Sequence, residues 1–185
     1  LAEAISEEYS SEGSLDLFSI LDCHVITFSF GPYGDAFDGM LEHLRKRFHV
    51  YCNSDRLKTV TSTRARFTIA HELGHYFIDE HRNQLSSGKV PAHGSVCEFE
   101  SDLLVEREAD LFASNLLMPP RRFSKYSKGV QRGLSGILDL AAHFKVSITS
   151  AAIQYVQSQP SSGILIKWSP SGFAWAWSFG LPCEK

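Results

Sequence analysis

Five consecutive residues, His71-Glu72-Leu73-Gly74-His75, constrain this chain more than any other part of its sequence. Two histidines four positions apart lie one turn apart on the same face of an α-helix, where both imidazoles can bind one metal ion. Glu72, beside the first histidine, can reach a water molecule on that metal. The segment therefore predicts a metal-binding helix, provided that the surrounding sequence is helical.

The sequence on both sides of the two histidines is that of an amphipathic helix. No proline interrupts residues 61–90, and Ser62 or Thr63 can cap the helix N-terminus. Gly74 lowers helix propensity, but a glycine between the histidines also lets another backbone approach closely. Apolar and small residues recur at helical spacing, at Phe67, Ala70, Gly74, Phe77 and Ile78. We therefore expect a helix of roughly four turns, and we prefer a metal site to the alternative of two ordinary helix histidines beside a surface acid.

A second predicted helix, residues 102–118, offers candidates for a third metal ligand and is stopped by Pro119-Pro120. Glu106 and Asp110 lie in line with its apolar stripe, and a buried carboxylate needs a cation or a metal-bound partner. Catalytic zinc takes three protein ligands, so we expect Glu106 to be the third ligand and Asp110 to accept the free N–H of a ligand histidine. Glu108 points roughly 200° away from Glu106, and we expect it to be a solvated acid that pairs with a neighbouring base.

Composition narrows the class of protein. The chain has 185 residues, 43% of them hydrophobic, which is enough for one domain with a core. A net charge of −3 does not suggest a nucleic-acid binder, and no apolar stretch is long enough to span a membrane. The acidic N-terminus does not resemble a signal peptide. Four scattered cysteines fit reduced thiols, so we expect a cytoplasmic protein: Cys23, Cys52, Cys97 and Cys183.

Two sequence blocks, RARFTIAHELGHYFIDEH and EREADLFASNLLMPP, together resemble the ImmA/IrrE family of zinc metallopeptidases. The resemblance extends from about residue 15 to residue 157 and implies an α+β, zincin-like peptidase core with a small antiparallel or mixed sheet. It implies one Zn²⁺ per chain, held by His71, His75 and Glu106, with Asp110 supporting a histidine and Glu72 activating a zinc-bound water. The chain looks like the stand-alone peptidase form, without an evident N-terminal helix-turn-helix domain.

The same resemblance implies a protein substrate. Relatives of this kind cleave a helix-turn-helix transcriptional repressor and so derepress genes of mobile elements or of stress responses. The alternative is a zinc-bound regulator that sequesters a repressor or an antitoxin by contact alone. A pure binder does not need a water-activating glutamate, so Glu72 favours the enzyme. The oligomeric state is not indicated by the sequence.

Other side chains are candidates for stabilising the oxyanion or contacting substrate, and the sequence does not choose among them: His81, His93, His143 and Tyr126. An extended substrate can add to the edge of a sheet. The predicted strand 48–53 is our candidate for that edge, and an ordinary core strand is the equal alternative. A further strand is predicted at 22–30, whereas 37–46 is ambiguous.

The remaining segments are expected to form loops, a pair of helices and a hairpin. Residues 81–101 and the basic segment 121–128 are expected to be loops, although the basic segment also suits an acidic substrate segment or DNA. The second helix of the 134–160 pair has no lysine or arginine, so packing on the core is preferred to DNA binding. Alternation in the last residues predicts a hairpin with an aromatic face that packs in the core by default and binds a partner if exposed. The expected divisions are an acidic tail (1–14), the peptidase core (15–133), a helix-turn-helix-like segment (134–160) and the β-hairpin (161–185).

Overall fold

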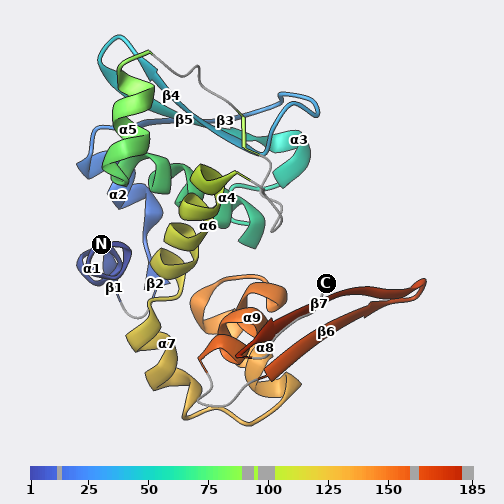
Figure 1. The fold of residues 1–185 in the computed structure, drawn as a ribbon. Helices are drawn as coiled ribbons and strands as arrows, with labels where there is room; N and C mark the ends of the chain where they lie inside the picture. The colour runs from blue at the N-terminus through green and yellow to red at the C-terminus, as the bar shows by residue number, and fades with distance from the viewer. Residues whose placement is uncertain (12–13, 89–93, 96–102, 159–162, 181–185) are drawn as a thin grey trace. The chain divides into compact units, whose positions relative to one another are not determined.

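The structure is a computed structural model that describes residues 1–11, 14–88, 94–95, 103–158 and 163–180. The chain forms two compact units, Leu1–Pro119 and Pro120–Lys185. Helices and small sheets make it an α+β fold, as predicted (Figure 1).

The first unit is built around a three-stranded mixed sheet. Its strands are β3 (Thr27–Gly31), β4 (Gly39–Leu44) and β5 (Arg47–Asn53), in the order β3-β5-β4. β5 pairs parallel with β3 and antiparallel with β4. β5 is the central strand and β4 lies at the edge, so of the two alternatives for residues 48–53 the core strand is confirmed and the edge strand is wrong.

The turn between β4 and β5 explains why the sequence of residues 37–46 is ambiguous. Leu44 pairs with Arg47, so Arg45 and Lys46 form a two-residue loop, and both have positive φ values, 48° and 68°. Such a turn matches the twist of a hairpin but normally uses asparagine and glycine. Without those residues, the sequence carried no recognisable hairpin signal.

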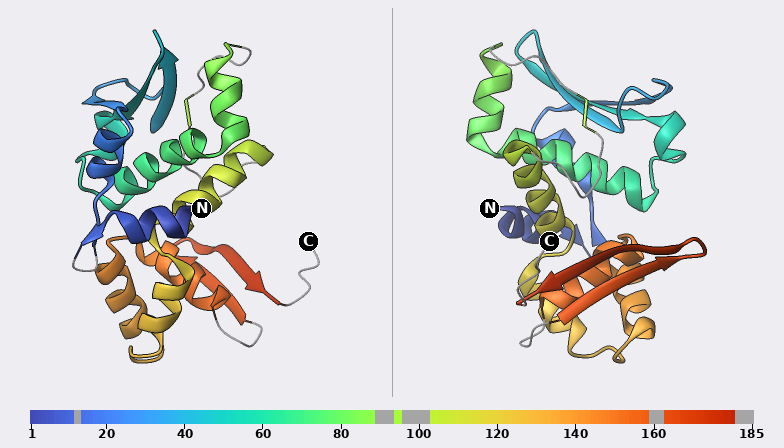
Figure 2. Two further views of the ribbon diagram at one scale, coloured as in Figure 1. Left: turned by 90° about the vertical axis from the view of Figure 1, so that its left-hand side faces the viewer. Right: turned by 45° about the vertical axis from the view of Figure 1, so that its right-hand side comes forward.

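The helices of the first unit lie below and beside its sheet in the view of Figure 1. They are α1 (Ala2–Glu8), α2 (Leu17–Cys23), α3 (Ser54–Leu57), α4 (Thr63–Phe77), α5 (Asp79–Ser86) and α6 (Leu104–Leu117), with a short antiparallel pair, β1 (Ser10–Ser11) and β2 (Ser14–Leu15). α4 lies beneath the sheet, and α6 crosses α4 (Figure 1; Figure 2).

Three helices lie where the sequence suggested something else. The acidic tail contains α1, which buries Ala2 and Ile5. The predicted strand at 22–30 begins only at Thr27, because Asp16 caps α2 and that helix continues to Cys23. α5 occupies the start of the expected loop at 81–101. The sequences of α1 and α5 are largely polar, which hid these two helices, whereas the short apolar run of α2 does not distinguish a helix from a strand.

The core of the first unit lies between the sheet and the two crossing helices. Alternate residues of the sheet are buried, among them Leu41, Val50 and Cys52. From the helices, Ala65, Ile69, Leu73, Ala109, Ala113 and Leu116 are completely buried. The burial of the Cys52 thiol raises its pKa, so this cysteine is an unreactive core residue.

The second unit contains α7 (Pro120–Ser127), α8 (Leu134–Phe144), α9 (Ile148–Gln157), β6 (Gly163–Ser169) and β7 (Gly172–Phe179). The expected loop at 121–128 is wrong, because α7 begins at Pro120, a favourable first helical position, and buries Phe123. The helix pair is as predicted, and Ser147 caps α9 by accepting a hydrogen bond from Ser150 N at 3.0 Å.

The C-terminal hairpin is also confirmed, with Ser169 paired to Gly172 across its turn. Four of its apolar side chains are more than half exposed: Ile164, Ile166, Trp168 and Phe173. These residues therefore do not follow the expected default of core packing. Among the described residues, no single helix has the length and apolarity to cross a membrane; judged by those two properties alone, the bent pair α8 and α9 qualifies.

Candidate metal centre

Helix α4 carries His71, Glu72 and His75 on its buried side. Ser62 caps the helix, accepting a hydrogen bond from Ala65 N at 3.1 Å, as the sequence predicted. His71, Glu72 and His75 are at most 3% exposed. Three polar side chains at this depth need partners close by.

The partners of the two histidines come from α6, which approaches α4 closely at Gly74. A Cβ atom on Gly74 would lie only 3.1 Å from the Cα atom of Ala109. The missing side chain thus allows the two backbones to cross in near contact, which is the role that the sequence suggested for this glycine. The crossing brings the buried face of α6 up to the two histidines.

Glu106, His71 and His75 converge on one point. His71 Nε2 lies 3.1 Å from His75 Nε2 and 3.1 Å from Glu106 Oε2, and His75 Nε2 lies 3.6 Å from Glu106 Oε1. One ligand atom from each of the three residues lies within 4.8 Å of the others. Two imidazole nitrogens and one carboxylate oxygen are the donor set of a His₂Glu catalytic zinc site. The residues therefore fit zinc.

Asp110 lies behind the first histidine. Its Oδ1 is 2.8 Å from His71 Nδ1, so it accepts the N–H on that side of the ring and directs Nε2 towards Glu106 and His75. Burial disfavours the charged form of His71, but the hydrogen bonds to Asp110 and Glu106 outweigh it and raise its pKa to about 10. The surroundings of this ring thus favour a positive charge, as expected of a cation site.

Glu72 lies against the backbone of β4. A Cβ atom on Gly39 would be 2.8 Å from Glu72 Oε1 and 2.3 Å from Thr68 Cγ2, so any larger residue at this position would force the side chains of Glu72 and Thr68 to shift. Gly39 also exchanges backbone hydrogen bonds with Ser95: Ser95 N donates to Gly39 O at 2.8 Å. The sheet edge therefore runs directly past Glu72. Sequence reasoning missed Gly39, because nothing local marks its contact with a helix so far along the chain.

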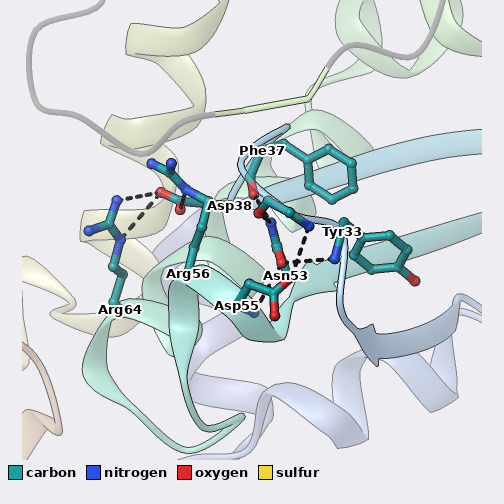
Figure 3. A network of polar contacts seen from close by, with 8 residues as sticks. Tyr33, Phe37, Asp38, Asn53, Asp55, Arg56 and Arg64 are labelled. Atoms are coloured by element: carbon teal, nitrogen blue, oxygen red, sulfur yellow. Dashed lines mark hydrogen bonds and ion pairs between the residues drawn. The ribbon is translucent and has the colours of Figure 1, made fainter.

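A buried carboxylate fixes the start of β4 over α4 (Figure 3). Asp38 is completely buried and accepts hydrogen bonds from Arg56 Nε at 2.6 Å and from Arg64 Nη2 at 2.7 Å. Burial raises the pKa of Asp38, but the two arginines more than compensate, so its pKa lies below the usual value. Asp38 thus joins β4 to α3 and α4.

The loop before β4 is held by Asn53, at the end of β5 (Figure 3). Its Nδ2 donates to Gly34 O and Phe37 O, both at 2.7 Å, and its Oδ1 accepts from Tyr33 N at 3.2 Å. One buried amide therefore satisfies backbone groups on both sides of the turn. No local sequence pattern marks Asn53 or Asp38, since their partners lie far away along the chain.

The residues predicted to contact the oxyanion or the substrate do not lie together in the structure. His81 is buried on α5, and its Nε2 lies 2.9 Å from Glu108 Oε2. Glu108 thus pairs with a base while Glu106 joins the histidines. Tyr126 and His143 stack on each other in the second unit, with ring centroids 3.8 Å apart. His93 lies outside the described residues, as do Cys97 and Cys183.

The family comparison agrees with this geometry. The model of the IrrE N-terminal-like domain family, Peptidase_M78, matches residues 20–154, which include both crossing helices. No curated protein matches the sequence. Because the match covers well over half of the chain and contains every residue of the metal centre, the chain belongs to the IrrE N-terminal-like family of zincin-type metallopeptidase domains.

Proposed function

We propose that this protein is a zinc-dependent endopeptidase that cleaves a helix-turn-helix transcriptional repressor and thereby derepresses mobile-element or stress-response genes. The observation that carries the proposal is the buried convergence of His71, His75 and Glu106 beside Glu72, which lies against the edge strand β4. The repressor as substrate rests on the family resemblance.

The side chains have separate roles in this proposal. His71, His75 and Glu106 hold the metal, and Asp110 keeps the tautomer and orientation of His71. When bound, zinc lowers the pKa of a coordinated water towards roughly 7 and polarises the scissile carbonyl. Glu72 accepts the proton of the attacking water and later delivers it to the leaving amine. His81, His93 and Tyr126 stay candidates for contacts with the oxyanion or substrate.

The edge of β4 supports a peptide substrate. Gly39 directs its N–H and C=O away from β5, towards Ser95. Residues two and four positions along a strand point the same way, so Leu41 and His43 present backbone groups on that side too. Apart from the bridge at Ser95, no described residue pairs with this edge. An extended segment can add at Leu41 and His43, next to the bridge that joins Gly39 to Ser95.

Incubation of the zinc-loaded protein with purified helix-turn-helix repressors tests the proposal, with intact mass spectrometry of the fragments as the readout. We expect one cut, and we expect Glu72→Gln to cleave about 10² to 10⁴ times more slowly while it still binds zinc. Cleavage by the variant at the wild-type rate would refute the role of Glu72. Stable binding of the repressor without any cleavage would instead favour the sequestering regulator.

A further inference from the structure

His81 is a third buried histidine next to the metal centre, but it is not one of the converging ligands. Only 3% of it is exposed. Its ring centroid lies 5.2 Å from that of His75, with the ring planes tilted by 43°. His81 therefore packs directly against a metal-ligand side chain.

Glu108 anchors this histidine from α6. The distance between His81 Nε2 and Glu108 Oε2 is 2.9 Å, and the Glu108 side chain is 46% exposed. Three acids of α6 thus contact three histidine rings. Glu106 lies next to the ligands His71 and His75, Asp110 contacts His71 from its other side, and Glu108 contacts His81. The pair of His81 and Glu108 joins α5 to α6 on the side of the site where His75 lies.

The second ring nitrogen of His81 argues against a purely stabilising role. His81 Nδ1 is buried and has no hydrogen-bond partner among the described residues. An apolar side chain would fill this space without an unsatisfied polar atom, and unsatisfied groups of this kind call for an explanation other than stability.

We propose that His81, held by Glu108, is a positioning residue for His75. The anchored ring of His81 restricts rotation of the His75 imidazole and keeps His75 Nε2 directed at His71 Nε2, 3.1 Å away. The inference rests on the zinc site of the proposed function and deepens it. It gives His75 a support of its own, as Asp110 gives one to His71.

The test compares His81→Ala and Glu108→Gln with Arg107→Gln, a matched control that also removes one charge from an exposed α6 residue. Two readouts are used on the full chain: the zinc Kd by chelator competition and the visible spectrum of the Co²⁺-loaded protein. We expect His81→Ala to raise the zinc Kd about tenfold, the lower end for residues that support a ligand, and to shift the Co²⁺ bands. Glu108→Gln should have a smaller effect in the same direction.

The double variant should bind zinc no more weakly than His81→Ala alone, because Glu108 acts through His81. A zinc Kd and a Co²⁺ spectrum like those of Arg107→Gln in both single variants would overturn the inference, even if their melting temperatures fall. If His81→Ala does not fold, Glu108→Gln decides by the same criterion. Failure of the wild-type protein to bind zinc would refute the metal site itself, a result distinct from unchanged binding in the variants.

Discussion

Asp110 is the single residue whose role can be measured most cleanly, since it touches His71 only on the ring nitrogen that faces away from the other ligands. Asp110→Asn keeps the shape of the side chain but removes the charge that holds the His71 N–H. We expect the zinc Kd to rise about 10- to 100-fold, as measured by chelator competition. Glu80→Gln, an exposed acid on α5, is the control and should bind zinc like the wild type. Equal zinc affinity in Asp110→Asn would contradict the supporting role.

Helical periodicity was sufficient to place the metal-site residues on the two helices. Glu106 and Asp110 were singled out because they share a stripe with buried residues, and the structure sets both against histidines of α4. The partner of Glu108 was not predictable in the same way. Its contact with His81 depends on α5, a helix whose sequence reads as a polar loop.

Among the elements, the crossing of α4 and α6 depends on the missing side chain of Gly74. In Gly74→Ala the new Cβ would meet Ala109 Cα at 3.1 Å and Phe112 Cβ at 3.3 Å. Alanine adds about 1 kcal/mol of helix propensity, but overpacking costs about 1–3 kcal/mol. We therefore expect a net loss of about 1 kcal/mol in the free energy of unfolding and weaker zinc binding.

Urea unfolding and chelator competition measure the two effects. Gly129→Ala is the control, because its Cβ would make only an ordinary contact, 3.5 Å from Tyr126 O. A variant of Gly74 that is more stable than the wild type and binds zinc equally well would show that the helices have room to separate.

The attachment of β4 to α3 and α4 is predicted to depend on pH through Asp38. Its folded pKa lies below the ordinary value of 3.8, so its ion pairs contribute stability above about pH 4 that is lost as the pH falls through the folded pKa. Asp38→Asn should lower the free energy of unfolding at pH 7 by about 2–3 kcal/mol. Urea titrations at pH 7 and below pH 4 test this, and the difference between variant and wild type should shrink in acid. A constant difference would contradict the ion-pair account.

The arrangement of these elements was less predictable than their existence. The helix that carries the histidines, the helix of Glu106 and the C-terminal helix pair all have strong periodicity and visible caps. Strand order depends on pairings that no local pattern records. The sequence left open whether β5 is an edge or a central strand, because β4 is not recognisable and the Arg45-Lys46 turn that joins them uses residues unusual for positive φ.

At the scale of the whole molecule, charge is divided unevenly between the two units. Pro120–Lys185 contains eight lysines and arginines against two acids, a net charge of +6, whereas Leu1–Pro119 contains ten against nineteen, a net charge of −9. The total of −3 conceals this division. The acidic unit is the one that contains the metal centre, so its surplus of carboxylates attracts divalent cations to that unit.

Zinc should therefore stabilise the fold as a whole, because its ligands join α4 to α6 and an unfolded chain does not hold them together. A ligand at 100 times its Kd adds about 2.7 kcal/mol, which for a chain of this size raises the melting temperature by roughly 5–10 °C. Differential scanning calorimetry with zinc and with excess chelator measures the shift. It should shrink at acid pH, where protons compete for the ligands, and disappear in His71→Ala. A shift of equal size in that variant would mean that the stabilising zinc binds elsewhere.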